Sequence, residues 1–220
     1  MKKIFKDLIK ETLRGKSLPR ILINDRMRKT EIIKGRILDL ASGTKKPSYY
    51  RFLKVDDSAD IVSVDISDER KPKIKVDLEK PFPFKTEEFD YVFCFNLLEH
   101  IYNHSNLINE AYRVVKENGK LIGTVPFLGS VHGDPDDYFR YTKSALNNIF
   151  KEAGFKDIKI ESLGYGPFAV CYYMTEFLLP KFIRPIFVFP SILFDKIIFK
   201  LNKRHGKDKY VLMYYFECIK

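Results

Sequence analysis

The chain contains no tryptophan, and its three cysteines are too few and too widely spaced for a disulfide framework or a metal site. Cys94, Cys171 and Cys218 stand in apolar surroundings, so we expect buried thiols in a reducing compartment and no resident metal. Uncharged apolar runs never reach the roughly 18 residues that a membrane-spanning helix needs. The stretch MKKIFKDLIKETLRGK (1–16) is amphipathic and basic and lacks the apolar centre of a secretory signal, so we do not expect export.

Acidic residues are scarce relative to basic ones. The 220 residues include 39 Lys and Arg against 29 Asp and Glu, a formal net charge of +10. Such a charge favours an anionic partner, which could be nucleic acid, a membrane surface or a phosphorylated carrier. Residues 1–30 alone hold ten basic side chains against three acidic ones. The length suits one well-buried domain with an appendage and is short for two full domains.

Apolar runs rich in β-forming residues alternate with helical stretches along most of the chain. The expected strands are 36–41, 60–66, 73–78, 89–98, 119–127, 156–163 and 209–219. A helix within 103–119 is expected to end at Asn118-Gly119, and another covers about 142–153. Strands that are apolar on both faces and alternate with helices predict a doubly wound, mainly parallel α/β sheet.

Two segments stand outside that alternation. Residues 1–34 are expected to form a basic helical segment, and 35–220 the main domain with an apolar, basic insertion at about 165–208. Prolines are expected to break the insertion into pieces too short to cross a membrane. Eight Lys and Arg against three Asp and Glu over 168–209, beside large apolar side chains, suit a surface that rests on anionic lipid. A helical subdomain packed over the sheet is an equally good interpretation.

The segment ILDLASGTKK (37–46) reads as a strand that runs into a turn with one glycine, Gly43. A dinucleotide-binding loop needs three glycines in G-x-G-x-x-G spacing. The turn is therefore a degenerate dinucleotide site, a site for a ligand without pyrophosphate, or simply a tight turn. Asp39 lies within the first strand just before the turn, Asp65 ends the second strand and Asp77 ends the third; singly, Asp65 could cap a helix and Asp77 could begin a turn. Together they favour a ribose, an adenine amine and a cationic amino group, which describes S-adenosylmethionine better than NAD.

The ordered motifs resemble those of class I S-adenosylmethionine-dependent methyltransferases, in particular the type 11 group. The first motif appears as LDLASGTK, with Ala41 in place of a glycine, the second as VSVDI, and the third as VDLEKPFPFKTEEFDYVFCFNLLEHI. INEAYRVVKENGKLIGTVP resembles the helix and fifth strand that follow. The resemblance covers about 35–163 and the last strand. It implies a Rossmann-like sheet of seven strands with an antiparallel last strand and the helical, apolar insertion before it.

The resemblance also implies S-adenosylmethionine as the cofactor and assigns roles at the matching positions. Asp39 and the Gly43 backbone would hold the methionine moiety, Asp65 the ribose and Asp77 the adenine amine. The full set of expected cofactor positions is Asp39, Ala41, Ser42, Gly43, Asp65, Ile66, Asp77, Leu78 and Asn96. Because the Ala41 methyl fills space that the family leaves empty, we expect weakened but retained binding.

The segment HGDPDDYFRYT (132–142) follows the fifth strand and should reach the same edge of the sheet. His132 is the candidate general base, with Tyr138, Arg140 and Tyr141 shaping the acceptor pocket. The alternative is ordinary loop structure, in which Asp136 or Thr142 caps the next helix and Arg140 pairs with a neighbouring aspartate. His100 is expected beside the cofactor or packed under the sheet, while His104 and His205 should lie on the surface.

Similar D-Y-F-R-Y-T stretches occur in methyltransferases of cell-surface polysaccharide and lipid-linked glycan assembly, and this resemblance guides the functional prediction. We expect methyl transfer to an O or N atom of a small or carrier-linked acceptor, a glycan or lipid-linked molecule. A cytoplasmic location, with peripheral contact to anionic lipid on the inner face of the cell membrane, is expected, and no nucleic-acid partner. The alternatives are an RNA methyltransferase and a non-catalytic binding or scaffold protein that retains the fold.

Overall fold

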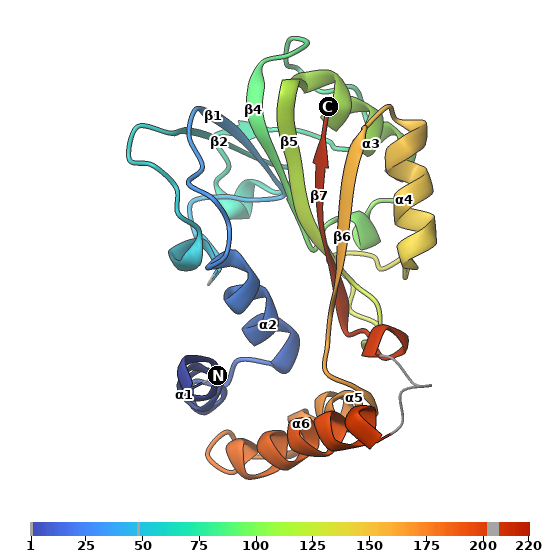
Figure 1. Cartoon of the computed structure of the whole chain (residues 1–220). Helices are drawn as coiled ribbons and strands as arrows, with labels where there is room; N and C mark the ends of the chain where they lie inside the picture. Colours follow the sequence, from blue (N-terminus) through green and yellow to red (C-terminus); the bar gives the residue numbers. More distant parts are fainter. Residues whose placement is uncertain (1, 48, 202–206) are drawn as a thin grey trace.

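A computed structural model, which describes residues 2–47, 49–201 and 207–220, shows one seven-stranded sheet (Figure 1). The strand order is β3-β2-β1-β4-β5-β7-β6. The strands are β1 (Arg36–Leu40), β2 (Asp60–Asp65), β3 (Ile74–Lys75), β4 (Phe89–Phe95), β5 (Val115–Pro126), β6 (Asp157–Leu163) and β7 (Met213–Ile219). The first five are parallel, and β7 lies antiparallel between β5 and β6. The predicted doubly wound sheet with an antiparallel last strand is confirmed.

Helices cover the sheet unequally. The α-helices are α1 (Lys2–Leu13), α2 (Leu18–Met27), α3 (His104–Val114), α4 (Lys143–Glu152), α5 (Pro167–Thr175) and α6 (Arg184–Leu201). Short 3-10 turns are η1 (Tyr50–Phe52), η2 (Asp68–Arg70), η3 (Leu98–His100), η4 (Glu176–Leu178) and η5 (Lys207–Lys209). Helices α3 and α4 pack on one face, and each begins at a side-chain cap, Asn103 and Thr142 respectively. The other face is covered by α2 and the segment around η1, which bury Met27 and Tyr49 against β4.

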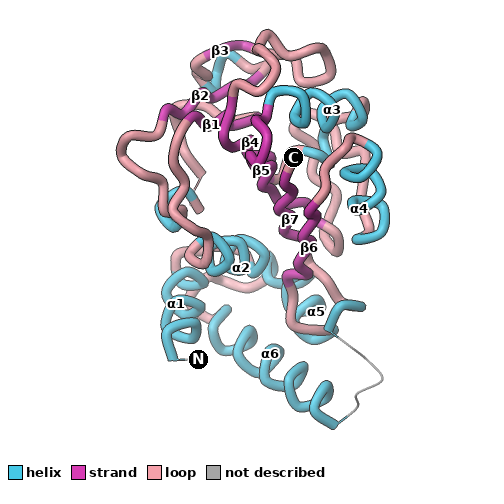
Figure 2. The backbone as a smooth tube through the Cα atoms, turned by 45° about the horizontal axis from the view of Figure 1, so that its top comes forward, coloured by secondary structure: helices cyan, strands magenta, loops and turns pink. Residues whose placement is uncertain are grey.

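A helical layer, which shares α2 with the covered face of the sheet, lies beyond the carboxyl ends of the parallel strands. Helices α1, α2, α5 and α6 gather there (Figures 1 and 2), so the N-terminal segment and the insertion form one cap over that edge. The cap has its own core, which includes Leu18, Ala169 and Val188. Asp195 of α6 is fully buried and accepts the backbone N–H groups of Phe168 and Ala169 at 3.0 and 2.9 Å. These bonds satisfy the open amides at the start of α5 and fix the two helices to each other.

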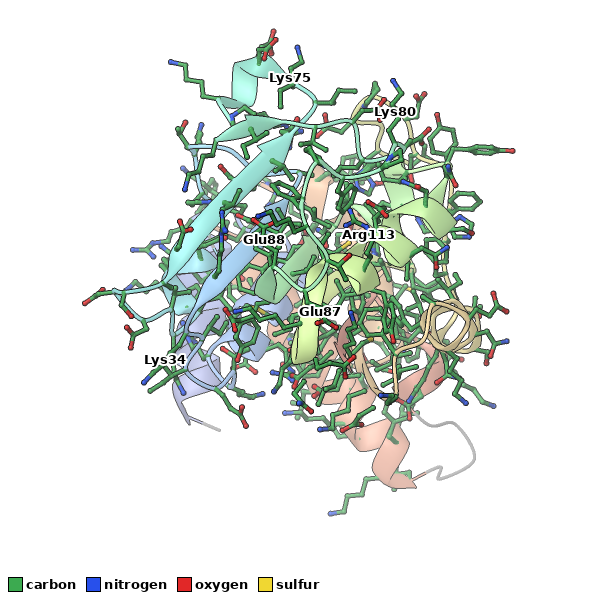
Figure 3. All side chains as sticks on the ribbon, turned by 90° about the horizontal axis from the view of Figure 1, so that it is seen from above. Lys34, Lys75, Lys80, Glu87, Glu88 and Arg113 are labelled. Carbon is green, nitrogen blue, oxygen red and sulfur yellow. The ribbon has the colours of Figure 1, made fainter. Side chains whose placement is uncertain are left out.

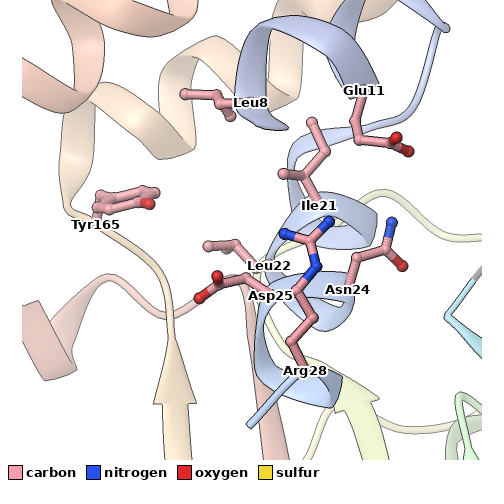
Figure 4. Close-up of a pocket in the computed structure, with 8 residues that line it drawn as sticks. All are labelled: Leu8, Glu11, Ile21, Leu22, Asn24, Asp25, Arg28 and Tyr165. Carbon is pink, nitrogen blue, oxygen red and sulfur yellow. The ribbon is translucent and has the colours of Figure 1, made fainter. Parts of the chain in front are cut away.

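The two ends of the molecule differ in their surfaces. Seen from above (Figure 3), the labelled side chains carry both signs, among them Lys34, Glu88 and Arg113. Many of these charges are paired, as in the 2.9 Å contact between Arg36 and Glu88. Beneath the sheet, a cavity of only about 20 Å³ lies between α1, α2 and Tyr165 (Figure 4). It has room for about one water molecule and cannot be a ligand site.

Several local predictions were wrong. The helix within 103–119 ends at Val114 because Val115 is buried and pairs with Phe89, so that β5 begins there; Asn118 has φ 62° within β5. The third strand shrinks to two residues. Helix α6 continues through Pro190, which therefore does not break the insertion at that point.

Three side-chain expectations also need comment. Cys171 is exposed rather than buried, whereas Cys94 and Cys218 are buried as predicted. His104 is half-buried, with its ring against Phe139 and Tyr141 at 5.1 and 5.8 Å between ring centroids. His205 lies outside the described residues. Within the described part of the chain, no helix combines the length and the apolar character needed to span a bilayer.

Candidate active site

The polar residues predicted to hold a cofactor come together at the carboxyl edge of the sheet. Asp39 lies at the end of β1, Asp65 ends β2, and Asn96 directly follows β4. These three strands are neighbours in the sheet, and parallel strands end on the same side. A ligand at this edge therefore meets all three side chains, at the place where ligands of doubly wound sheets bind.

Asp39 is 1% exposed, and one of its carboxylate oxygens has three hydrogen-bond partners. Its Oδ2 atom accepts hydrogen bonds from the hydroxyl groups of Ser42 and Tyr50 and, at 3.0 Å, from the Lys46 ammonium. A buried carboxylate needs such partners to offset its lost hydration. A cofactor ammonium group that binds the Oδ2 atom of Asp39 would have to share or replace the Lys46 contact.

The Asp65 carboxylate is likewise buried and bound by other groups of the protein. Its Oδ1 atom accepts the backbone N–H of Ser67 at 2.8 Å, and its Oδ2 atom lies 3.5 Å from Arg70 Nε. Arg70 also pairs with Asp134 in the loop after β5. The Arg70 side chain thus links the predicted ribose site to the predicted acceptor loop, and a ribose that uses Asp65 would displace it.

The remaining predicted adenine-side residues are spread over the turns after β2 and β3. Asp77 lies two residues beyond β3, and Lys80, 3.0 Å away, donates to it and lowers its pKa. Its other oxygen accepts the backbone N–H of Glu79 at 3.1 Å. Ile66 is 58% exposed, while Leu78 is buried in the main core.

Close packing in the turn after β1 restricts the size of its residues. A Cβ atom on Gly43 would lie 1.7 Å from the carbonyl oxygen of Arg70, so only glycine fits. Thr44 donates its N–H to that same carbonyl at 3.1 Å. Ala41 has φ 52°, in the left-handed region that glycine adopts without strain. Alanine at this position therefore costs conformational strain.

A cavity of about 210 Å³ adjoins this edge and is bounded by three layers of the molecule. Asn96 and His132 line it from the sheet, Arg20 from the start of α2, and Tyr173 from α5. The Asn96 Oδ1 atom accepts a hydrogen bond from the Thr124 hydroxyl at 2.6 Å. This bond fixes the side-chain amide between the predicted cofactor position and the cavity. Sequence reasoning missed Arg20 and Tyr173, because only the folded cap brings them to the cavity.

Of the four residues predicted for the acceptor side, His132 lines the cavity and the other three do not. Arg140 forms a two-pronged ion pair with Asp137 and donates to the backbone carbonyls of Phe139 and Ser130, so it holds the loop in shape. Tyr138 is half-exposed, and its hydroxyl donates to Asp136 at 3.0 Å. Tyr141 is buried in the main core and donates to the Leu98 carbonyl. Thr142 caps α4 by accepting the Ala145 N–H at 3.2 Å.

A carboxylate and two imidazoles converge beside the cavity. Glu99 and His100 belong to η3, directly after β4, and His132 follows β5. Glu99 is fully buried, and this burial raises its pKa to about 8. The resemblance had pointed to Glu99-His100, but not to their meeting with His132. The adjacent carboxyl ends of β4 and β5 were the signal that could have revealed it.

Comparison with known proteins agrees with this geometry. The family described as "Methyltransferase domain" matches residues 35–123, which run from the start of β1 into β5. A protein of Methanocaldococcus jannaschii is 31% identical over 142 residues, which are 60% of this chain and 69% of the relative.

Solved structures show the same fold at low identity. An S-adenosylmethionine-dependent methyltransferase from Archaeoglobus fulgidus aligns over 97% of this chain and 98% of its own, with a TM-score of 0.60 and 18% identity. A phosphoethanolamine N-methyltransferase of Haemonchus contortus, in complex with S-adenosylmethionine, aligns over 92% of this chain, with a TM-score of 0.51 and 17% identity. This chain spans about half of that enzyme, 52% of its length.

The fold and the acidic carboxyl edge define a class I methyltransferase, an enzyme with S-adenosylmethionine as its cofactor. The chain belongs to the methyltransferase-domain family that matches its residues 35–123.

Proposed function

We propose that this enzyme methylates an O or N atom of a small or carrier-linked acceptor, a glycan or lipid-linked molecule, at the surface of an anionic membrane. The observation that carries the proposal is the cavity of about 210 Å³ beside Asn96, which α5 of the insertion helps to enclose. The insertion therefore contributes both a wall of the proposed acceptor site and an exposed surface next to it.

Methyl transfer from a sulfonium needs the sulfur, the methyl carbon and the acceptor atom in line, with water excluded. Because Asn96 lies both at the cofactor edge and in the cavity wall, an acceptor in the cavity adjoins the cofactor position. His132 can accept the acceptor's proton through Nε2. Asp137 positions this imidazole, since it accepts the His132 backbone N–H at 2.8 Å and lies 3.6 Å from Nδ1.

Arg20 supports an acceptor with an anionic group. Its Nη1 atom is buried without a hydrogen-bond partner, and among the described residues no carboxylate pairs with its guanidinium. Burial lowers the pKa of Arg20, yet its guanidinium stays charged. A half-buried guanidinium in a cavity wall, over the Tyr49 ring and without a carboxylate partner among the described residues, is stabilised by a bound anion, and a phosphate of a carrier or lipid has the matching geometry.

The insertion supports a membrane surface. Its exposed large apolar side chains, here called the cap surface, are Phe168, Met174, Phe177, Leu178, Phe182, Ile186, Phe187, Leu193, Phe194, Ile197 and Leu201. Two of the acidic residues in this segment, Glu176 and Asp195, are buried, whereas Lys181 and Lys200 are exposed. An exposed surface that combines large apolar side chains with exposed lysines fits the headgroup region of anionic lipid.

Vesicle flotation tests the membrane part of the proposal. Wild-type protein should float with vesicles that contain phosphatidylglycerol, and less with pure phosphatidylcholine. Phe177 and Phe182, 74% and 69% exposed, can be replaced together by serine without disturbing the core. The double variant should lose at least about tenfold in vesicle affinity, while Ile32→Ser, exposed outside the insertion, should not. Equal flotation of all three proteins would refute the membrane proposal.

Transfer of labelled methyl groups into cell extracts tests the acceptor. Label should enter the lipid or glycan fraction, and Arg20→Met should reduce incorporation by at least tenfold while cofactor binding persists. Incorporation into RNA alone would refute this acceptor class. An enzyme that labels the glycan or lipid fraction equally well with Arg20→Met would remove the argument for an anionic acceptor group.

A further inference from the structure

The Glu99, His100 and His132 side chains approach each other from two neighbouring strand ends. The Glu99 Oε1 atom lies 3.7 Å from His100 Nε2 and 4.0 Å from His132 Nε2. One ligand atom from each residue falls within 4.8 Å of the others. The two rings meet edge to face with 5.1 Å between their centroids. None of these separations is a hydrogen bond, because all exceed 3.5 Å.

The hydrogen bonds around the two imidazoles direct their free nitrogen lone pairs toward Glu99. His100 Nδ1 lies 2.6 Å from the backbone carbonyl oxygen of Asp136, which can only accept, so Nδ1 carries the proton. Its Nε2 atom therefore presents a lone pair to Glu99. His132 has the same arrangement, with Nδ1 3.3 Å from the Ser130 carbonyl oxygen.

Glu99 completes this pattern. It is fully buried, and neither of its carboxylate oxygens has a hydrogen-bond partner among the described residues. An unpartnered buried carboxyl group is costly to folding. A cation placed between Glu99 and the two imidazoles would satisfy all three groups at once.

We propose that Glu99, His100 and His132 bind a divalent first-row transition-metal ion of the zinc or cobalt type. Two imidazoles and a carboxylate form a donor set that holds such ions with an open coordination position. Ligands about 2.0–2.2 Å from a tetrahedral ion lie roughly 3.3–3.6 Å apart. The contacts of Glu99 with the two imidazoles, 3.7 and 4.0 Å, thus need to shorten by about 0.1–0.7 Å, and the two imidazole nitrogen atoms, which lie within 4.8 Å of each other, by at most about 1.5 Å.

The surroundings of the cluster match those of metal-binding histidines. Such histidines donate their second ring N–H to a backbone carbonyl or a carboxylate, which fixes the tautomer. His100 does so to Asp136, and His132 lies against Ser130 with Asp137 behind it.

The metal would sit at the edge of the acceptor cavity. His132 lines that cavity, so an open coordination position can bind an acceptor oxygen and favour its deprotonated form. This part of the inference rests on the proposed function. The Nε2 atom of His132 cannot bind a metal and accept a proton at the same time, so the metal would replace His132 as the group that activates the acceptor.

Metal titration of the full chain tests the proposal. After removal of adventitious metal with a chelator, Zn²⁺ should bind with one-to-one stoichiometry by calorimetry, and Co²⁺ should give the intense visible absorption of a four-coordinate site. Glu99→Gln and His132→Asn should each weaken Zn²⁺ binding by about 100-fold or more, since even indirect support residues change affinity 10–100-fold. His104→Gln is the matched control, because His104 lies outside the cluster and should leave binding unchanged. A Cys171→Ser background removes the exposed thiol as a competing ligand.

Two results would overturn the metal site: absence of Zn²⁺ and Co²⁺ binding, or binding that survives Glu99→Gln unchanged. Titration of the same variants with S-adenosylhomocysteine reports whether each is folded and keeps its cofactor site. Lost metal binding with retained cofactor binding in the variants supports the site. Metal binding in a protein that methylates no acceptor would instead refute the proposed function and leave the metal site standing.

Discussion

A single methyl group added at Gly43 should disable the cofactor site. The Cβ atom of Gly43→Ala would lie 1.7 Å from the Arg70 carbonyl oxygen and 2.6 Å from its carbonyl carbon, both backbone atoms. Ordinary contact begins at 3.4 Å, so the turn after β1 and the segment at Arg70 must separate by about 1.7 Å. Overpacking of this kind costs about 1–3 kcal/mol. The same movement strains the 3.1 Å bond between Thr44 and Arg70 and shifts Arg70 relative to Asp65.

Calorimetric titration with S-adenosylhomocysteine and thermal unfolding measure both consequences. We expect affinity to fall at least tenfold, equivalent to about 1.4 kcal/mol. The unfolding midpoint should drop by about 2–12 °C, since each kcal/mol shifts a domain of this size by about 2–4 °C. Gly129→Ala is the control, because its nearest neighbour, the Tyr173 hydroxyl, lies at an ordinary 3.5 Å. Wild-type cofactor affinity in Gly43→Ala would refute the close approach of these two segments.

Two further substitutions separate cofactor binding from cap stability. Asp65→Asn keeps the shape of the side chain but removes its charge, and it should weaken S-adenosylhomocysteine binding by about 10–100-fold. Asp68→Asn, at an exposed neighbouring position, should leave the affinity unchanged. Equal affinities of the two variants would exclude Asp65 from the cofactor site. Burial raises the pKa of Glu176 to about 7 from 4.5, so the folded protein binds the proton more tightly and the free energy of unfolding should fall as pH rises from about 4.5 to 7. The Glu176→Gln variant should lack that fall, and at pH 8 it should be more stable than the wild-type protein by about 1–3 kcal/mol in urea unfolding. If the free energies of unfolding of the two proteins changed in parallel with pH, the raised pKa of Glu176 would be refuted.

Much of the candidate site could be read from the sequence because it depends on local order. Asp39, Asp65 and Asn96 each stand at the end of an apolar run, and parallel strands bring their carboxyl ends to one edge. The helix start at Thr142 was an open alternative in the sequence and is the observed cap. Boundaries were less predictable: the end of α3 depends on the pairing of Val115 with Phe89, a contact between distant residues.

The sequence by itself determined the class of the protein, since the period of its apolar runs and the order of its motifs need no long-range contact to be recognised. Only the tertiary structure decided that α1 and α2 of the N-terminal segment and α5 and α6 of the insertion form one cap over the carboxyl edge. Tertiary packing also brought Arg20 and Tyr173 to the cavity beside Asn96 and placed Lys46 and Arg70 on Asp39 and Asp65, the carboxylates predicted to bind the cofactor. Glu99, His100 and His132 met for the same reason: their approach depends on how two strand ends and a 33-residue span, 100–132, fold back together. Such contacts depend on side-chain packing between segments far apart in the chain, which no local pattern encodes.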